Sequence, residues 1–419
     1  MLGWPTCTFV NARVVTPEGE ASSIRFRRRV LSIDERPHPN DHVVDLDGRF
    51  VLPGLINAHD HLELNHYGTL KGREQYGNAR EWIGDLAPVI RSPEVREKSR
   101  TRLGDRLFVG GLKNLLSGVT TVAHHNPMYC AFGLHFPVRV VSRFGWAHSV
   151  GMEHRPVGAY GEPGGIVAER AASTPPDVPF IVHAAEGVDA VAASEIDVLE
   201  ASGSLRSNTV IVHGLAVTPE RWHSLFEQGV SLVWCPQSNI FLFGRTLCMP
   251  CLLESPSARR HVCLGSDSRV TGTRDLLDEL RTAANAGVAL ADLYRMVTSW
   301  SADILRLPDA GRITIGAPAD FTVIPPKVDS AEGSLLRCFR SDVSLVVRRG
   351  TPLVGDPALE GAFAARSVHV RPIEIDGQRR LMQAGLARRI ERCSIHEPGV
   401  RCVSPESARS SCLRGASTS

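Results

Sequence analysis

The stretch 51-VLPGLINAHDH-61 decides the fold, because its apolar run leads into two histidines separated by one residue. Side chains on a strand alternate between its two faces, so His59 and His61 would point to the same side. Other apolar runs also end in polar groups that could carry chemistry. They are PFIVHAAE (179–186, with His183 and Glu186), NTVIVHG (208–214, with His213) and HVCLGSD (261–267, with Asp267). The pattern predicts buried parallel strands whose carboxyl ends bring these groups together.

Between Leu55 and about Leu307, short apolar runs alternate with amphipathic stretches, which is typical of repeated strand–helix units around a parallel sheet. Further strands are predicted at 118–125, 144–151 and 230–236, and helices at 95–117, 193–202, 219–228 and 273–286. Thr273 is the expected N-cap of the last helix. Only 57 residues separate His125 from His183, so the third or fourth strand should be short or irregular. We therefore predict an α/β fold of the (β/α)₈ TIM-barrel type.

The two ends of the sequence show a different pattern. Residues 1–52 and 311–370 consist of short strands and turns, and neither segment alone supplies enough strands to bury a core. We predict that they form one small composite β-sandwich, beside a barrel formed by residues 53–310. Residues 371–419 are rich in Arg and Ser, and we assign them to a tail that can be partly disordered. The pattern in this tail also allows a helix around Gln378–Cys393.

Composition argues against several classes of protein. The 419 residues include 47 Lys+Arg and 45 Asp+Glu, and a net charge of +2 does not suggest a nucleic-acid-binding protein. No apolar run reaches the roughly 18 residues of a membrane-spanning helix, and the N-terminus lacks the features of a signal peptide. Ten cysteines are unremarkable for a reduced cytosolic protein. We expect a cytoplasmic protein that binds neither nucleic acid nor membrane.

Three imidazoles and a carboxylate at one end of a barrel would form a site of the Zn²⁺ type, with one position open for water. Water bound to such a metal ionises near neutral pH and becomes a nucleophile. A single histidine at a strand end is more often a hydrogen-bonded core residue than a ligand. Several such groups in register are harder to explain by packing, because burying unpaired polar groups costs several kcal/mol, on the order of 2–7 each. The sequence therefore favours a metal site.

At this point the motifs resemble those of the amidohydrolase superfamily, whose metal-dependent hydrolases are built on a distorted (β/α)₈ barrel. The closest branch holds cytosine, guanine and adenosine-type deaminases and triazine chlorohydrolases. The resemblance covers about residues 5 to 350. It is carried by VLPGLINAHDH, HAAE, VIVHG, CPQSN and LGSDS, and by RITIGAPADFTVI, which is similar to strands of the C-terminal sandwich.

The resemblance implies a role for each strand-end residue. His59, His61, His183 and Asp267 match the metal ligands, and Asp267 also matches the group that accepts the proton of the attacking water. His213 matches a histidine that contacts water or substrate in mononuclear members and binds a second metal in dinuclear members. Glu186 matches a glutamate that delivers protons to a ring nitrogen or leaving amine. In the alternative interpretation, Glu186 only stabilises the following helix through its dipole.

The resemblance also bears on metal count and substrate contacts. Dinuclear members bridge two metals with a carboxylated lysine on the fourth strand, and no lysine occurs between Lys113 and Lys327. A glutamate such as Glu153 could replace it, but one metal ion is the expectation. The remaining candidates are substrate-binding residues or groups facing the barrel mouth. They are Asn239 in CPQSN, His154 in EHRP, Trp82 in REWI, and one of His124 and His125.

We predict a mononuclear hydrolase, with Zn²⁺ as the first choice and Fe²⁺ as the second. Its metal-bound hydroxide would attack a C–N bond at an sp² carbon of a small-molecule substrate. Deamination of a nitrogen heterocycle is the first hypothesis. The alternatives are an amidase, an imidazolone-type hydrolase or a chlorohydrolase of the same superfamily, and a non-catalytic scaffold on this fold. A homodimer is the default expectation for the assembly.

Overall fold

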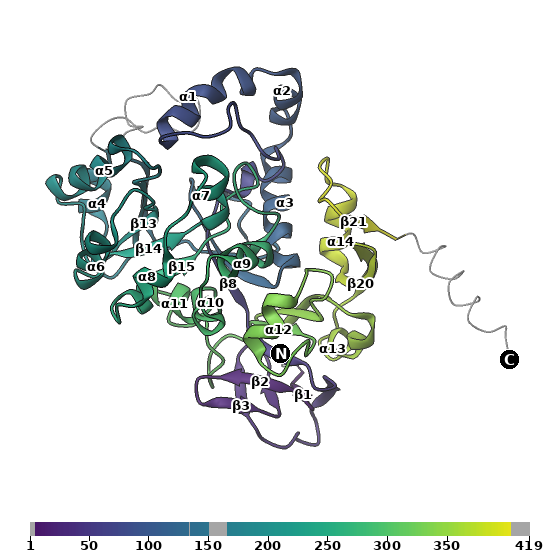
Figure 1. The fold of residues 1–419 in the computed structure, drawn as a ribbon. Coiled ribbons are helices and arrows are strands. Elements are labelled where there is room, and N and C mark those ends of the chain that lie inside the picture. The colour runs from purple at the N-terminus through teal and green to yellow at the C-terminus, as the bar shows by residue number, and fades with distance from the viewer. Residues whose placement is uncertain (1–4, 134, 151–165, 404–419) are drawn as a thin grey trace. The chain divides into compact units, whose positions relative to one another are not determined.

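The computed structural model describes residues 5–133, 135–150 and 166–403, which fall into two compact units (Figure 1). The first unit combines the residues up to Gly54, the short segment Leu115–Gly118 and the residues from Ile313 onward. The second unit comprises Leu55–Asn114 and Val119–Arg312. Each unit has its own hydrophobic core.

The second unit is built on eight parallel strands in its described residues. They are β8 (Leu55–Asp60), β9 (Val119–His124), β10 (Arg139–Val140), β11 (Gly145–Ser149), β12 (Phe180–Ala184), β13 (Thr209–His213), β14 (Ser231–Trp234) and β15 (Val262–Leu264). Hydrogen bonds join them in the orders β10-β9-β8 and β11-β12-β13-β14-β15. Parallel neighbours in chain order are the arrangement of the predicted distorted (β/α)₈ barrel. Most of these strands are completely buried, so they are almost continuously apolar until their carboxyl ends.

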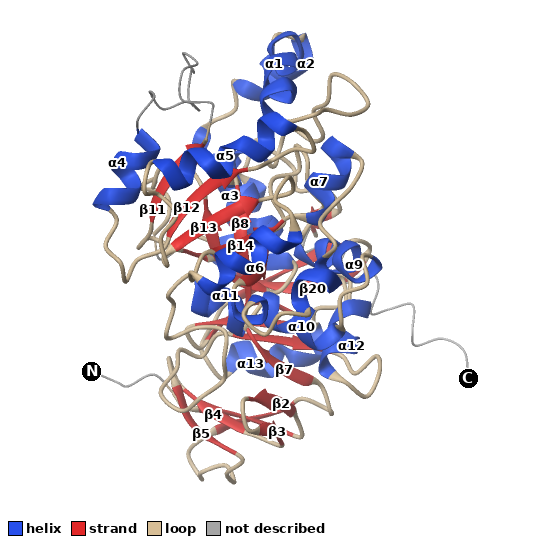
Figure 2. Cartoon of the chain, turned by 60° about the vertical axis from the view of Figure 1, so that its left-hand side comes forward, coloured by secondary structure: helices blue, strands red, loops and turns tan. Residues whose placement is uncertain are grey.

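Helices follow most of these strands, and Figure 2 shows α4 and α5 beside β11 to β13. The helices of this unit are α1 (Ala79–Ile90), α2 (Pro93–Ser99), α3 (Leu103–Leu116), α4 (Ile166–Ser173), α5 (Ala190–Ala201), α6 (Pro219–Glu227), α7 (Pro236–Phe243), α8 (Met249–Leu253), α9 (Leu276–Asn285), α10 (Leu290–Met296) and α11 (Ser299–Ile304), with 3₁₀ turns η1 (Leu62–Leu64) and η2 (Ala258–Arg260). The expected N-cap of α9 was wrong. Asp275 caps the helix, because its carboxylate accepts hydrogen bonds from the backbone N–H groups of Leu277 and Asp278. Thr273 instead donates to the Asp275 carbonyl oxygen and the Glu279 carboxylate.

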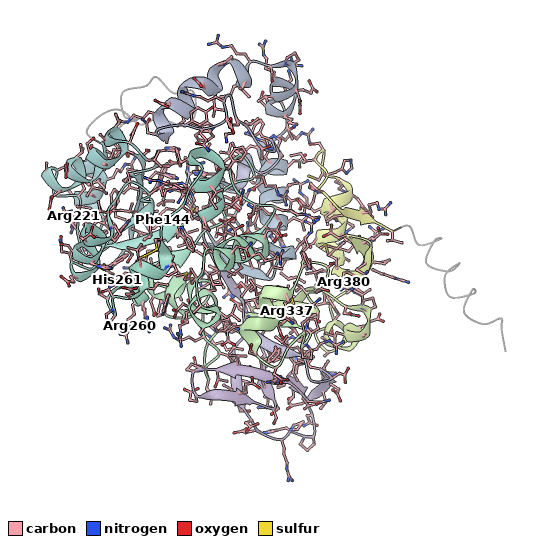
Figure 3. All side chains as sticks on the ribbon, in the orientation of Figure 1. Phe144, Arg221, Arg260, His261, Arg337 and Arg380 are labelled. Atoms are coloured by element: carbon pink, nitrogen blue, oxygen red, sulfur yellow. A yellow bond between two sulfur atoms is a disulfide. The ribbon has the colours of Figure 1, made fainter. Side chains whose placement is uncertain are left out.

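The third and fourth strands are irregular, as the short spacing predicts. Strand β10 has two residues, and only the link Val141–Phe144 separates it from β11. Val141 is buried in the barrel core, and Phe144, which is labelled in Figure 3, packs against the same cluster. The pairing of β11 with β12 shifts register between Trp146 and Ser149. The irregularity includes His148, whose carbonyl oxygen contacts His183 at the carboxyl end of β12.

The first unit contains two sheets. The four-stranded sheet has the order β5-β4-β1-β6, from β1 (Cys7–Val10), β4 (Ile24–Phe26), β5 (Val30–Ile33) and β6 (His42–Asp45). The nine-stranded sheet has the order β21-β19-β20-β18-β17-β16-β7-β2-β3, from β2 (Arg13–Thr16), β3 (Gly19–Ala21), β7 (Phe50–Pro53), β16 (Phe321–Ile324), β17 (Leu345–Arg348), β18 (Thr351–Gly355), β19 (Val370–Ile375), β20 (Gln378–Gln383) and β21 (Val400–Cys402). Its helices are α12 (Ala331–Arg337), α13 (Glu360–Ala364) and α14 (Ala384–Glu391), with the turn η3 (Pro357–Leu359).

Aromatic side chains from both sheets share one core. Phe9 and Phe26 meet edge to face at 4.8 Å between ring centroids, and Phe26 meets Phe321 at 5.2 Å. The N- and C-terminal segments also pair directly, because β7 runs antiparallel to β16. Two sheets with a common apolar interior form a sandwich.

Residues 371–402, which belong to the segment 371–419 expected to form a partly disordered tail, form regular structure. These residues continue the nine-stranded sheet, and β19 and β20 form a hairpin around Asp376–Gly377, both with positive φ (48° and 81°). An Asp-Gly pair between alternating apolar residues is a strong hairpin signal, and Ile373, Ile375 and Met382 are buried. The many arginines obscured this alternation. The helix that the sequence allowed around Gln378–Cys393 is α14, which begins only at Ala384 because residues Gln378–Gln383 form β20.

The described residues contain a short-range disulfide but no membrane-spanning helix. No helix in the described ranges is long and apolar enough to cross a membrane. Cys248 and Cys251 form a disulfide at the start of α8, and no other disulfide occurs among the cysteines that the structure describes.

Candidate active site

The predicted strand-end residues lie together at the carboxyl ends of the barrel strands. His59 lies in β8, His183 in β12 and His213 at the end of β13. Asp267 follows β15 by three residues, and its backbone runs beside His59, because the N–H of Asp267 donates to the His59 carbonyl oxygen at 3.1 Å. Gly265 permits this approach, since a Cβ there would lie 2.6 Å from the Cβ of His59.

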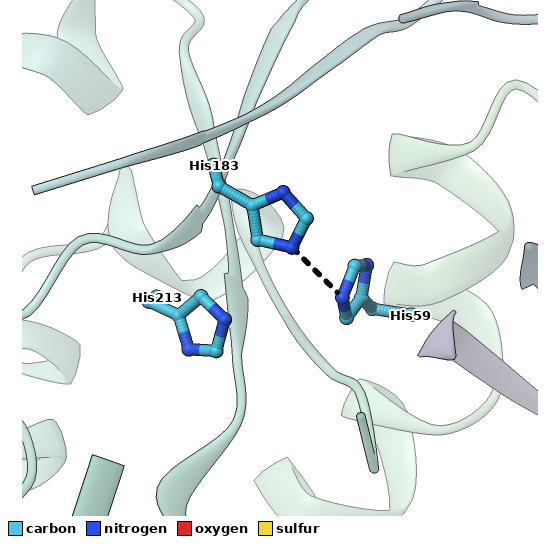
Figure 4. Close-up of side chains that lie close together, drawn as sticks. All are labelled: His59, His183 and His213. Carbon is cyan, nitrogen blue, oxygen red and sulfur yellow. Dashed lines mark hydrogen bonds between the residues drawn. The ribbon is translucent and has the colours of Figure 1, made fainter. Parts of the chain in front are cut away.

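The imidazole nitrogens converge on a common point. Nε2 of His59 lies 3.2 Å from Nε2 of His183 (Figure 4). The same Nε2 lies 3.9 Å from Oδ1 of Asp267. Ligand atoms of His59, His183 and His213 all lie within 4.8 Å of one another, and so do those of His59, His61 and Asp267. His59 belongs to both sets. A metal ion beside His59 Nε2 could therefore take ligands from either set.

Hydrogen bonds at the far side of two imidazoles fix their tautomers. Nδ1 of His183 lies 2.6 Å from the carbonyl oxygen of His148, which can only accept. Nδ1 of His213 lies 3.1 Å from Oδ1 of Asn239. Both Nδ1 atoms must therefore carry the proton, which leaves the lone pair of each Nε2 facing the cluster. Such outer hydrogen bonds orient metal-binding imidazoles in proteins.

The carboxylate of Asp267 is held by three donors. Oδ2 accepts from the hydroxyls of Thr271 (2.7 Å) and Ser238 (3.0 Å), and Oδ1 accepts from the backbone N–H of Ser268 (2.6 Å). Burial alone would raise the pKa of Asp267, but His61, His213 and these hydrogen bonds outweigh it and lower the pKa. The residue is thus an anion despite its burial.

The cluster has the electrostatics of a metal site. Burial, together with the other imidazoles, lowers the pKa values of His59 and His183 well below 6.5. Neutral imidazoles and an ionised carboxylate are the forms that bind a metal, and nitrogen-rich sets of this kind suit Zn²⁺. The buried Nδ1 of His59 has no hydrogen-bond partner. The donor set therefore fits a divalent metal ion.

Glu186 lies beside this cluster. Its Oε1 is 3.7 Å from Nε2 of His213, and burial raises the pKa of Glu186. It belongs to neither ligand set. A buried carboxyl group that can stay protonated near the metal is suited to deliver a proton to a substrate.

The predicted substrate-binding residues have different surroundings. Asn239 is buried in α7 and contacts His213, so it supports a histidine of the cluster. Trp82 is half-buried on α1, and its indole N–H donates to the Leu70 carbonyl oxygen at 3.1 Å. His154, and the alternative bridging residue Glu153, lie outside the described residues.

Two further histidines lie in the cluster that the sequence analysis did not assign to it. His125 stacks on His183 with 4.4 Å between ring centroids, and His148 lies 5.2 Å from His183 and 6.2 Å from His125. Burial lowers the pKa of His148 to about 3. His148 is the next-to-last residue of β11, but it lies inside the strand predicted at 144–151, so the strand-end argument did not single it out. Between His124 and His125, it is His125 whose ring packs against His59, His61 and His183.

A second carboxylate lies next to His61. Glu63 is buried, and its Oε1 accepts from the side-chain amide of Asn126, which also lies 3.2 Å from Nδ1 of His61. His124 faces Glu63 at 3.8 Å and packs against Phe132. Glu63 follows the His-Asp-His motif by two residues, and this short spacing was the signal in the sequence that could have placed Glu63 near the cluster.

Comparisons with known proteins agree with this architecture. The model of the amidohydrolase family matches residues 171–353. A 5-methylthioadenosine/S-adenosylhomocysteine deaminase of Natronomonas pharaonis is 27% identical over 335 residues, which are 68% of this chain and 75% of that protein. The triazine hydrolase of Arthrobacter aurescens has a similar structure, with a TM-score of 0.66, 19% identity, and coverage of 87% of this chain and 99% of that chain. A zinc-bound adenosine deaminase of Xanthomonas campestris has a TM-score of 0.63, 19% identity, and coverage of 87% and 98%.

The comparisons confirm the predicted fold type and the predicted class of enzyme, a metal-dependent hydrolase that acts on carbon–nitrogen bonds other than peptide bonds. Residues 171–353 thus match the amidohydrolase family, and the chain is similar in sequence to deaminases and in fold to a triazine hydrolase and an adenosine deaminase.

Proposed function

We propose that this protein is a mononuclear metal-dependent deaminase of an amino-substituted nitrogen heterocycle. The observation that carries the proposal is the approach of His59 Nε2 to His183 Nε2 at 3.2 Å, with Glu186 at 3.7 Å from His213. One side of the cluster could thus hold a metal, and the other side could supply a proton.

We assign the metal to His59, His61, His183 and Asp267. Zn²⁺ is the first choice because neutral imidazoles dominate the set, and Fe²⁺ is the second. A single ion is favoured because the fourth barrel strand, β11, carries His148 and no lysine that could become a carboxylated bridge. His213 then remains available to water or substrate.

A divalent metal in this site would activate a water molecule for attack and would polarise the substrate at the carbon that the water attacks. Asp267 would accept the proton of that water through Oδ1, whose neighbour Oδ2 is already occupied by two hydroxyls. His213, held by Asn239, would orient the water or the substrate. Glu186 would deliver a proton to the ring nitrogen or to the departing amine, because a weakly basic heterocycle must be protonated as the carbon is attacked.

The relatives narrow the first substrates to test. The Natronomonas protein is a deaminase of adenine nucleosides by name, and the Xanthomonas structure is that of an adenosine deaminase. We infer that a 6-aminopurine nucleoside is the first substrate class for this chain. The structural likeness to a triazine hydrolase supports a second candidate, hydrolysis of a substituted triazine with a different leaving group.

The experiment is a panel of adenosine analogues, aminopyrimidines, pterins and chlorotriazines, assayed with zinc-loaded and metal-depleted protein. Zinc-dependent release of ammonia from at least one amino heterocycle is expected. Release of chloride without ammonia would assign the second candidate instead. If zinc-loaded protein binds stoichiometric metal and releases nothing from any compound, the deaminase proposal fails. Light scattering of the same sample tests the expected homodimer.

A further inference from the structure

A buried ion pair lies behind the strand that carries His59 and His61. Asp60 lies between the two histidines, so its side chain points to the opposite face of β8. Its Oδ2 is 3.2 Å from Nζ of Lys113 on α3, and both side chains are completely buried. The proposed mechanism uses neither residue.

Lys113 contacts three other groups around this pair. Its ammonium donates to Oδ1 of Asn65 (2.9 Å), Oγ of Ser266 (3.2 Å) and the backbone carbonyl oxygen of Asp267 (2.8 Å). The cation thus joins α3, the end of β8 and the loop that follows β15. Asn65 and Asn114 complete the shell, because each donates to one oxygen of Asp60.

This cluster lies where the barrel lacks a regular ladder. Among the described strands, hydrogen-bonded pairing ends at β8 on one side and at β15 on the other. Side chains bridge the seam instead. Asn57 of β8 accepts from the backbone N–H of Ser266 at 3.0 Å and donates to its hydroxyl at 2.8 Å. The hydroxyl of Ser266 in turn donates to the Asp267 carbonyl oxygen at 3.0 Å.

The backbone of Asp267 needs such support. Its φ is 51°, in the left-handed region that an L-residue with a side chain rarely adopts. Strained residues of this kind persist where their surroundings fix them. Lys113 and Ser266 both donate to the Asp267 carbonyl oxygen, which fixes the orientation of the peptide group that follows Asp267.

We propose that Lys113 is a positioning residue that sets the spacing between the histidines of β8 and the carboxylate of Asp267. The assignment of these residues as metal ligands is part of the proposed function, on which this inference rests. Outer-shell groups that orient metal ligands contribute roughly 10- to 100-fold to metal affinity. We expect an effect of that size from Lys113, although its ammonium faces away from the cluster.

The test compares full-length Lys113→Met/Asp60→Asn with wild type, since the double change removes both buried charges together. The metal dissociation constant is measured for Zn²⁺ by competition with a chelating dye, and ligand geometry by the visible absorption of the Co²⁺-loaded protein. We expect zinc affinity to fall roughly 10- to 100-fold and the cobalt bands to shift. If the double variant does not fold, Ser266→Ala tests the same network, because it removes one acceptor of Lys113 and one donor to the Asp267 carbonyl oxygen, and it should weaken zinc binding in the same direction.

Arg340→Met is the matched control. Arg340 is an equally buried cation, paired with Asp376 at 2.9 Å and with Glu397 in the other unit of the chain. The Arg340→Met substitution should lower the melting temperature and leave the zinc affinity and the cobalt spectrum unchanged. A folded Lys113 variant with wild-type zinc affinity and spectrum would overturn the proposal, and so would an equal loss in Arg340→Met. A wild-type protein that binds no metal would end both proposals, whereas one that binds zinc without deaminating any compound would end only the proposed function.

Discussion

Replacement of Glu186 by glutamine separates proton delivery from metal binding. The glutamine keeps the size of the side chain but cannot deliver a proton at neutral pH. Glu186 belongs to neither ligand set, and its nearest oxygen is 3.7 Å from His213 Nε2, so the metal should remain bound. General acid–base catalysis contributes roughly 10²- to 10⁴-fold to a rate. We therefore expect kcat to fall by that factor, which corresponds to about 3–5 kcal/mol of transition-state stabilisation.

The assay is ammonia release at saturating substrate, with zinc content measured on the same sample. Glu195→Gln is the control, because Glu195 is also buried on the same side of the barrel and accepts a hydrogen bond from the Ala185 N–H, yet it contacts Arg80 rather than the cluster. It should retain activity and zinc. Full activity in Glu186→Gln would refute proton delivery by Glu186. Loss of zinc together with activity would instead make Glu186 a ligand.

Three other substitutions test separate parts of the structure. Asp267→Asn should abolish turnover and weaken zinc binding in a folded protein, as measured by activity, zinc content and circular dichroism. Asn239→Ala should lower kcat roughly 10- to 100-fold, because Nδ1 of His213 loses its acceptor. Burial raises the pKa of Glu279 from 4.5 to about 8, so the folded state holds this proton between those pH values while the unfolded state releases it. Stability should fall as pH rises through that window, by up to about 5 kcal/mol at 1.36 kcal/mol per pH unit. Glu279→Gln should remove this loss, and urea unfolding at pH 5 and pH 8.5 measures the difference.

The sequence was most informative where a predicted strand ends in a single polar residue. An apolar run that ends in His183, His213 or Asp267 specifies both a buried parallel strand and the end at which its polar group lies. The barrel strands and the convergence of these groups could therefore be predicted. The caps and hairpins were harder to predict, since Thr273 and Asp275 are both good capping residues and only the geometry of the loop decides between them.

Contacts between distant segments were beyond this kind of argument. Lys113 lies on a helix, where a lysine is normally exposed, and no local pattern places it against Asp60 and the Asp267 carbonyl. The hydrogen bond from Nδ1 of His183 to the His148 carbonyl oxygen lies at the register shift between β11 and β12, which no local pattern predicts. These contacts arise from the fold as a whole, so they had to be read from the structure.

The hydrogen bonds of Asp267 show how a local sequence pattern and contacts between distant segments act together. Oδ2 receives two hydroxyls, whereas Oδ1 receives one backbone N–H and lies nearer to His59 Nε2. A carboxylate oxygen offers about two lone pairs, so Oδ1 keeps one that is directed to the cluster. Strand order alone predicts an aspartate at this end of the barrel. Because Ser238 and Thr271 occupy Oδ2, Oδ1 is the oxygen that would meet a metal ion or a water molecule. The orientation of the peptide group that follows Asp267 depends in turn on Lys113 and Ser266, which donate to its carbonyl oxygen.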